Sequence, residues 1–278
     1  MRSKCKSRIT LISHELNRLQ GLTWRRVGER FVCEIRAQFV QLVFNSCSIL
    51  NLMCKNSKMR EVKAFLFDMN GTMINDMQYH ITAWYRILNE FGANISMERM
   101  KAECYGKNHE LIERILPGKF TEEEKDKLSF EKESQYQRDF RPHLKLLHGL
   151  ERFLKESYEA GIKLGIGSAA IRFNIDFVLD GLGIRSYFDA LVSADDVARS
   201  KPDPETWLKC ADVLKLPFGD CLVFEDSPKG AESALNAGMK CIIITSLHGK
   251  EEFTDYKNVI GFINDFDDIF IHDFLKPV

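Results

Sequence analysis

The chain has 278 residues, of which 45% are hydrophobic and 28% charged, a composition that excludes overall disorder and fits one large domain or two small ones. Its basic and acidic residues nearly balance, but residues 1–58 hold 11 Lys and Arg against 3 Asp and Glu, whereas residues 59–278 hold 28 against 37. The acidic larger part disfavours nucleic acid as a partner, because phosphate backbones need clustered basic side chains. A small metabolite is the better expectation.

The first 58 residues stand apart by this charge split. We expect a poorly structured extension that need not be native, with translation starting at Met59; a targeting peptide and a folded functional segment are the alternatives. Polar side chains interrupt residues 39–54 too often for a membrane span of about 20 apolar residues. The eight cysteines show neither metal-ligand nor disulfide spacing, so we expect a cytoplasmic protein without a membrane partner.

From residue 62 onward, short apolar runs alternate with amphipathic stretches, the pattern of βα units and a parallel sheet. The first predicted strand covers residues 62–67. The stretch before the second strand is far longer than a βα crossover needs, so a segment is inserted there. It repeats apolar residues at helical spacing up to Gly92, and Thr121 followed by three glutamates is typical of a helix N-terminus. We expect a helical cap domain over residues 76–141.

Pro142 and Gly149 mark the return to the core, where a helix is expected to end at Gly161. Further strands are predicted at residues 162–167, 190–193, 221–224, 240–245 and 259–263. The expected fold class is therefore α/β, with residues 59–75 and 142–278 forming a core around a parallel sheet and the cap inserted into it.

Polar residues that follow the predicted strands are the candidate site, because ligands bind at the carboxyl ends of strands in doubly wound sheets. They are Asp68, Ser168, Lys201, Glu225 and Asp226. A carboxylate such as Asp68 can attack phosphorus and split one hard displacement into two easier ones. A lone aspartate at a strand end is more often structural.

Gly71, with Thr72 beside it, permits a sharp turn that aims N–H groups at an anion; an ordinary turn is the alternative. Ser168 offers phosphate a hydroxyl and helix-opening N–H groups, or is merely an N-cap. Either residue alone is weak evidence for a phosphate site.

Lys201 precedes Pro202, which favours an extended lysine backbone, while Asp203 and Pro204 are expected to begin a helix as N-cap and first residue. A lysine held in this way is suited to be a fixed counter-charge to phosphate. An ordinary exposed lysine is the alternative.

Glu225 and Asp226 precede Ser227 and Pro228, an expected N-cap and first helical residue. Together with Asp68 they offer the carboxylates that Mg²⁺ prefers. An acidic first helical turn is the other interpretation.

These motifs resemble, in their order along the chain, those of the haloacid dehalogenase superfamily, and most closely its β-phosphoglucomutase-like branch. They are Asp68-Met69-Asn70-Gly71-Thr72, Ser168, Lys201-Pro202 and Glu225-Asp226, and the likeness covers nearly all of residues 61–278. The resemblance implies a Rossmann-like core with a four-helix cap that opens and closes over small phosphorylated metabolites, using Mg²⁺.

The resemblance also implies roles for these positions. Asp68 would be the nucleophile, and Ser168 and Lys201 would hold the phosphoryl group. The metal would be held by Asp68, the backbone carbonyl of Asn70, Glu225 and Asp226.

In the cap, Tyr79-His80 followed by Trp84 is similar to the branch's first cap helix, and Tyr105-Gly106-Lys107 to its substrate loop. Lys132 falls where the branch has a specificity lysine, and His109 where its mutases have an arginine for a distal phosphate. The implied substrate contacts are Gly71, Thr72, His80, Trp84, Gly106, His109, Lys132 and Ala169.

Asn70 departs from the family, whose phosphatases and mutases have an aspartate there that protonates the leaving oxygen. An amide has no titratable proton, and general acid–base help is typically worth ~10²- to 10⁴-fold. Either the leaving group needs no protonation, or His80 substitutes, or the Asn70-Gly71 amide deamidates to a carboxylate.

The sequence therefore predicts a Mg²⁺-dependent phosphatase of sugar-phosphate-like metabolites, slow or specialised because of Asn70, and we expect a monomer. A hexose-phosphate mutase is an alternative that His109 weakens. A non-catalytic phosphometabolite-binding protein is another. A phosphonate-cleaving relative is less favoured, because the cap lysine that it needs is replaced by His109.

Overall fold

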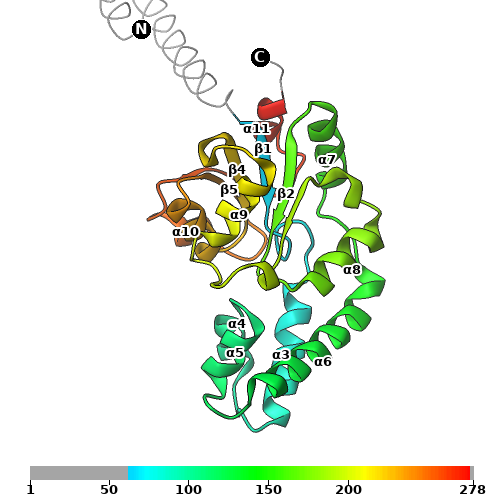
Figure 1. Ribbon diagram of the computed structural model, residues 1–278, viewed down its shortest axis with the longest axis vertical. Coiled ribbons are helices and arrows are strands. Elements are labelled where there is room, and N and C mark those ends of the chain that lie inside the picture. The colour runs from blue at the N-terminus through cyan, green and yellow to red at the C-terminus, as the bar shows by residue number, and fades with distance from the viewer. Residues whose placement is uncertain (1–61, 276–278) are drawn as a thin grey trace, which may run out of the picture. The chain divides into compact units, whose positions relative to one another are not determined.

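The polypeptide builds a six-stranded parallel sheet in the order β3-β2-β1-β4-β5-β6 (Figure 1). The structure is a computed structural model and describes residues 62–275, so our expectations for residues 1–58 lie outside the described residues. The strands are β1 (Ala64–Phe67), β2 (Lys163–Gly167), β3 (Ala190–Val192), β4 (Cys221–Glu225), β5 (Lys240–Ile244) and β6 (Val259–Ile263). All six predicted strands are present to within two residues, and the predicted α/β fold is confirmed.

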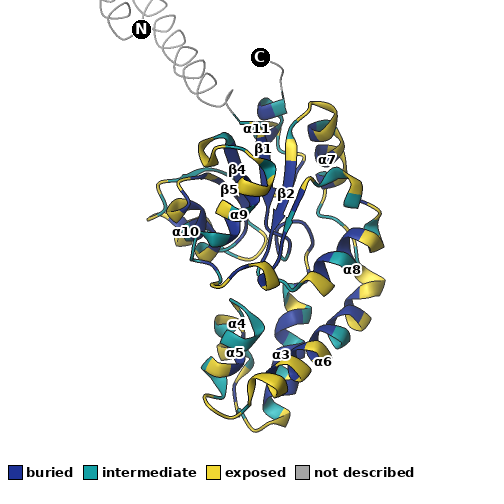
Figure 2. Cartoon of the chain, in the orientation of Figure 1, coloured by how far each residue is buried: buried dark blue, intermediate teal, exposed yellow. Residues whose placement is uncertain are grey.

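Both faces of the central strand β1 are buried, and successive residues of the strand point to opposite sides of the sheet (Figure 2). In β1, Phe65 and Phe67 join one hydrophobic cluster and Ala64 and Leu66 join the other. The first cluster contains side chains of α7 (Leu150–Glu159), α8 (Arg172–Leu182) and α11 (Ile269–His272), and the second those of α9 (Glu205–Leu214) and α10 (Pro228–Asn236). The central strand is thus covered by helices on each side.

Four helices lie between β1 and β2 in the chain, as the long insertion predicts. They are α3 (Met77–Glu90), α4 (Met97–Glu103), α5 (Asn108–Ile115) and α6 (Glu122–Phe140), and they share a third hydrophobic cluster. Thr121 caps α6 through a reciprocal pair of hydrogen bonds with Glu124. Residues Met59–Val278 form one compact unit, so the division into core and cap at residues 76 and 142 stays a prediction.

Two expectations about helix starts are wrong in detail. Helix α9 begins at Glu205 with Pro204 as its N-cap, although the carboxylate of Asp203 still accepts from the Glu205 N–H at 3.0 Å. Helix α8 begins only at Arg172, so Ser168 is not its N-cap. Instead the Ser168 hydroxyl accepts from the Ala170 N–H at 3.2 Å, within the turn that follows β2.

Within residues 62–275, no helix combines the length and the apolarity needed to cross a membrane.

Phe224 of β4 lies at the centre of the first cluster, and truncating it is expected to be costly. Its ring stacks on Phe67 with centroids 4.9 Å apart and meets Phe65 edge-on at 5.4 Å. We expect Phe224→Ala to lower the free energy of unfolding by about 3–5 kcal/mol, measured by urea denaturation. Val213→Ala, at a side chain that is 54% exposed, is the control and should change it by less than about 0.5 kcal/mol. Equal losses in the two variants would contradict this placement of the core.

Candidate active site

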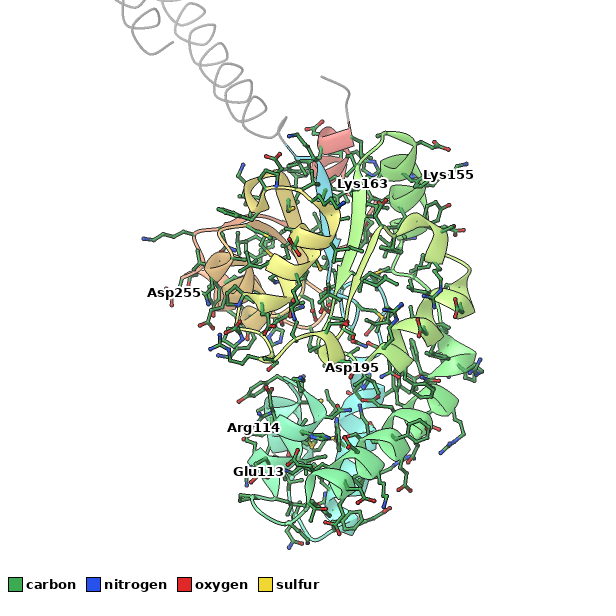
Figure 3. The ribbon with its side chains drawn as sticks, in the orientation of Figure 1. Glu113, Arg114, Lys155, Lys163, Asp195 and Asp255 are labelled. Atoms are coloured by element: carbon green, nitrogen blue, oxygen red, sulfur yellow. The ribbon has the colours of Figure 1, made fainter. Side chains whose placement is uncertain are left out.

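Side chains from three neighbouring strands meet at one edge of the sheet. Asp68 directly follows β1, Ser168 follows β2 and Glu225 ends β4, and β1 pairs with both other strands. Figure 3 marks the two ends of the sheet with Lys163 at the start of β2 and Asp195 just beyond β3. Because parallel strands end at the same edge, residues far apart in the chain form one cluster on the Asp195 side.

Lys201 reaches this cluster from the loop that follows β3. Its Nζ donates to Asp68 Oδ1 at 2.6 Å and to Glu225 Oε1 at 2.7 Å, and all three residues are buried. Burial alone would lower the pKa of the Lys201 ammonium, but the attraction of the two carboxylates raises it above its usual value. The lysine is therefore charged and fixed in direction.

Glu225 is held by more donors than its neighbours. Its Oε2 accepts from the Asp226 N–H at 3.0 Å and from both the N–H and the hydroxyl of Ser227 at 3.1 Å. A Cβ on Gly230 would lie 1.8 Å from this carboxyl group, so only glycine leaves room for it. Glu225 thus orients Lys201 and the start of α10, and its oxygens are more occupied than those of Asp68 and Asp226.

Three buried carboxylates at this edge form a group that fits a divalent cation. Oxygens of Asp68, Glu225 and Asp226 lie within 4.8 Å of one another. Burial raises the pKa of Asp68 to about 7, with Lys201 opposing the shift and Glu225 adding to it, and burial with the charge of Glu225 also raises the pKa of Asp226. Lys201 supplies only one positive charge to three carboxylates, so the residues present suit a cation of the Mg²⁺ type.

Gly71 and Thr72 are not among the residues that line the cavity at this site, and their substrate contact stays a prediction. The Thr72 hydroxyl donates to Asp226 Oδ1 at 3.3 Å. Gly71 has φ +82°, and a Cβ there would lie 2.1 Å from Asp226 Oδ2. The turn is built around the carboxylate of Asp226 rather than around an open anion position.

The amide of Asn70 has a fixed orientation. Its Nδ2 donates to Asp76 Oδ2 at 2.6 Å, and its Oδ1 accepts from the Ser168 hydroxyl at 3.4 Å. The Gly71 N–H, whose nitrogen would have to attack the amide during deamidation, instead donates to the Ile74 carbonyl at 2.8 Å. This geometry opposes deamidation, which stays a hypothesis for mass analysis to test.

His80 lines the cavity beside Asn70, but both its ring nitrogens already have protein partners. Nδ1 lies 2.6 Å from Lys132 Nζ, and Nε2 lies 3.2 Å from Asn70 Nδ2 and 3.3 Å from Asp76 Oδ2. Because an ammonium only donates, Nδ1 is the acceptor and Nε2 carries the proton toward Asp76. His80 would have to exchange one of these contacts before it could protonate a leaving group.

Lys132 is 1% exposed and is balanced by an equally buried acid, Glu133, whose Oε1 lies 3.0 Å from the Lys132 ammonium. Burial would raise the pKa of Glu133, but the Lys132 ammonium and two asparagine donors hold it well below its usual value. Lys132 also lies over the Trp84 ring, 5.0 Å from its centroid. The predicted specificity lysine is therefore a paired charge in the cavity wall.

A cavity of about 640 Å³ lies against these groups. Of the predicted site residues, it is lined by Asp68, Asn70, His80, Trp84, Gly106, Lys132, Ser168, Ala169, Lys201, Glu225 and Asp226. Helices α3 to α6 and the sheet edge both contribute residues to this lining.

His109 is not among the residues that line this cavity. Its ring lies 3.0 Å from Glu122 Oε2 and 2.9 Å from Asp126 Oδ1. Both acids belong to the first turns of α6 and hold the imidazole there. A contact of His109 with substrate stays a prediction.

The helices of the insertion and the loop that carries Lys201 are joined directly. Lys107 Nζ donates to the Val197 carbonyl at 2.8 Å, and the Ser200 hydroxyl donates to Glu110 Oε2. Gly106, which lines the cavity, lies next to this contact.

Sequence reasoning missed Asp76, which is fully buried beside Asn70. Its position before α3 suggests an N-cap, but its side chain makes no cap bond and accepts instead from Asn70 and, at 2.5 Å, from the Tyr136 hydroxyl. Burial and the charge of Asp76 raise the pKa of Tyr136, so that phenol remains a neutral donor. Cys104, which also lines the cavity, carried no signal in the sequence.

The α/β fold, the lysine-bound aspartate and the acidic cluster at the strand ends are together typical of a hydrolase with its active site at this edge of the sheet. A sequence model described as haloacid dehalogenase-like hydrolase matches residues 65–244. The chain belongs to this family of hydrolases, as the motifs of its strand ends predict.

Relatives agree with this assignment. The chain is 29% identical to a putative phosphatase, YhcW, of Bacillus subtilis over 70% of its own length and 89% of that protein. It is 31% identical to the β-phosphoglucomutase of Bacillus subtilis over 64% of this chain and 81% of that one. A crystal structure of an Entamoeba histolytica HAD hydrolase of family IA, variant 3, has a TM-score of 0.69 at 28% identity, covering 77% of this chain and 98% of the other.

Protons are expected to compete with Mg²⁺ for this site. Since the folded pKa of Asp68 is raised from 3.8 to about 7, its contribution to stability is fully present below pH 3.8 and is lost as the pH rises through 7. Without metal, stability should therefore fall over this range, whereas Mg²⁺ should bind more tightly at pH 8 than at pH 6. Calorimetric titration at both pH values and thermal unfolding check this. An Mg²⁺ affinity that is the same at both pH values contradicts it.

Proposed function

We propose that the protein is a Mg²⁺-dependent phosphatase of small sugar-phosphate-like monoesters. The main support for this proposal is the position of the Asp68 carboxylate. Lys201 fixes it beside a second acidic residue, Asp226, and both acids line the cavity. The named phosphatase and mutase relatives support a phosphorylated small molecule as substrate.

In this proposal an Asp68 oxygen attacks phosphorus while the bond from phosphorus to the ester oxygen breaks, which gives an aspartyl phosphate and an alkoxide that takes its proton from water. A second water then cleaves the acyl phosphate, releases inorganic phosphate and regenerates the carboxylate. Lys201 and Ser168 hold the phosphoryl oxygens. Asp68, the Asn70 carbonyl, Glu225 and Asp226 would hold Mg²⁺, which would neutralise charge on those oxygens.

The side chain of Asn70 limits turnover in this proposal, because its amide presents Oδ1 toward Ser168 and has no titratable proton to transfer. The amide can orient a hydroxyl or a water as an acceptor. We therefore expect that hydrolysis is slow, or that the substrate has a leaving group that departs without taking a proton.

A metabolite panel tests the proposal. Phosphate release that requires Mg²⁺ and stops with chelation supports it. An inert panel for both wild type and Asn70→Asp, while both proteins bind Mg²⁺, overturns it.

A hexose-phosphate mutase, which the β-phosphoglucomutase relative favours, would isomerise its substrate and need a bisphosphate primer. Calorimetric binding without turnover would favour a binding protein. The monomeric state and cytoplasmic location stay predictions.

A further inference from the structure

Trp207 of α9 lies beneath the cluster and contacts the phosphate-binding lysine of the proposed reaction. The residue is fully buried, and Lys201 Nζ lies 4.2 Å from the centroid of its ring. The same ammonium donates to Asp68 and Glu225. Two carboxylates and one aromatic face therefore surround a desolvated cation, the setting in which cation–π attraction is strongest.

The edge of the six-membered ring of Trp207 lies against Gly167, the last residue of β2 and the one before Ser168. A Cβ on Gly167 would lie 2.7 Å from Trp207 Cζ3 and 2.9 Å from Cε3. No room remains for the ring to shift toward β2 while that strand keeps its place. One side chain thus fixes its position against the strand that carries Ser168 and presents its face to Lys201.

Packing alone does not account for the choice of this side chain. The Trp207 Nε1–H is buried and has no hydrogen-bond partner among the described residues, a cost that a phenylalanine or leucine would avoid. Indole has the strongest attraction of the aromatic side chains for a cation on its face.

We propose that Trp207 is a positioning residue for Lys201: its ring, seated against Gly167, fixes the ammonium where it meets a phosphoryl group. This inference rests on the proposed function, because it takes Lys201 as a phosphate ligand. It assigns to Trp207 an effect on phosphate binding beyond its effect on stability.

The test uses calorimetric binding of inorganic phosphate to the full chain with Mg²⁺ present. Trp207→Met keeps much of the volume but has no aromatic face, and we expect about tenfold weaker phosphate binding. Trp207→Phe keeps a weaker face and should restore most of that loss. Phe153→Leu, in the cluster on the opposite face of the sheet, is the control that loses stability without losing phosphate affinity.

A second, independent test of the inference uses the variant Gly167→Ala. Its methyl group would displace the ring from its present position against Lys201, so phosphate should bind more weakly. Gly167→Ala/Trp207→Phe lacks the six-membered ring edge that the methyl group would meet, and it should bind phosphate more tightly than Gly167→Ala alone. Equal affinities for Trp207→Met and Trp207→Phe, or no rescue in the double variant, overturn the inference. If the wild type with Mg²⁺ binds no phosphate, the proposed function fails and this inference fails with it.

Discussion

Asp68→Asn is expected to abolish phosphate release, by a factor on the order of 10⁴ or more. An amide keeps the size of the side chain, and its oxygen can still face Lys201, but it cannot form the acyl phosphate. The measurement is phosphate release from the best substrate of the panel, at saturating Mg²⁺.

Asp220→Asn is a matched control, because its carboxylate lies just before β4, at the opposite end from the site, and pairs with the exposed Lys63. It should leave turnover within about twofold of wild type, as a surface ion pair contributes little. Phosphate release by Asp68→Asn near the wild-type rate would exclude covalent catalysis through Asp68.

Asn70→Asp is expected to raise turnover on alkyl phosphates by about 10²- to 10⁴-fold, the usual range for a general acid. One oxygen of the new carboxyl group would take the place of Asn70 Nδ2, which lies 2.6 Å from Asp76 Oδ2. Two carboxylates so close disfavour each other's ionisation, so the pair would hold a proton more tightly than a single carboxyl group does. That proton is the one that the leaving oxygen needs.

The double variant Asn70→Asp/Asp76→Asn tests whether a gain in turnover comes from the proton of the carboxylate pair or from a carboxyl group at position 70 alone. It exchanges the two side chains, keeps the net charge of the wild type and preserves an amide–carboxylate bond between the two positions. Because this variant lacks the second carboxylate that helps to hold the proton, its turnover should rise less than that of Asn70→Asp. A folded Asn70→Asp protein that binds Mg²⁺ without any gain in rate would contradict the role given to Asn70.

An acyl phosphate as substrate distinguishes the explanations for Asn70. Its leaving group is a carboxylate that departs without protonation, so Asn70→Asp should accelerate its hydrolysis less than that of an alkyl phosphate. Equal gains on both substrates would mean that the missing carboxylate acts mainly on the attacking water. The ratio of the two gains, measured as kcat/KM, decides between these steps.

Much of the site could be predicted because its residues follow strands. The apolar runs locate β1, β2 and β4, and parallel pairing brings their ends to one edge, so Asp68, Ser168 and Glu225 had to meet. No side-chain detail is needed for that conclusion. The roles of these residues stay proposals until they are mutated.

The orientation of side chains in and next to the inserted helices could not be predicted in this way. His109 turns to Glu122 and Asp126 on α6, although its position in the sequence suggests a ligand contact. Asp76 looks like an N-cap, but it lies against Asn70 and Tyr136. Each outcome depends on partners that other elements supply, and the periodicity of one helix contains no information about them.

The sequence by itself determined the fold class and the strand-end residues, because hydrophobic period and motif order are properties of the chain. Only the tertiary structure decided what surrounds them: Trp207 beneath Lys201, Gly71 and Thr72 around Asp226, and Asp76 and His80 around Asn70. The physical reason is that a buried polar group must find its partners wherever packing places them. The chemistry left to Asn70 is set by those partners as much as by its own amide.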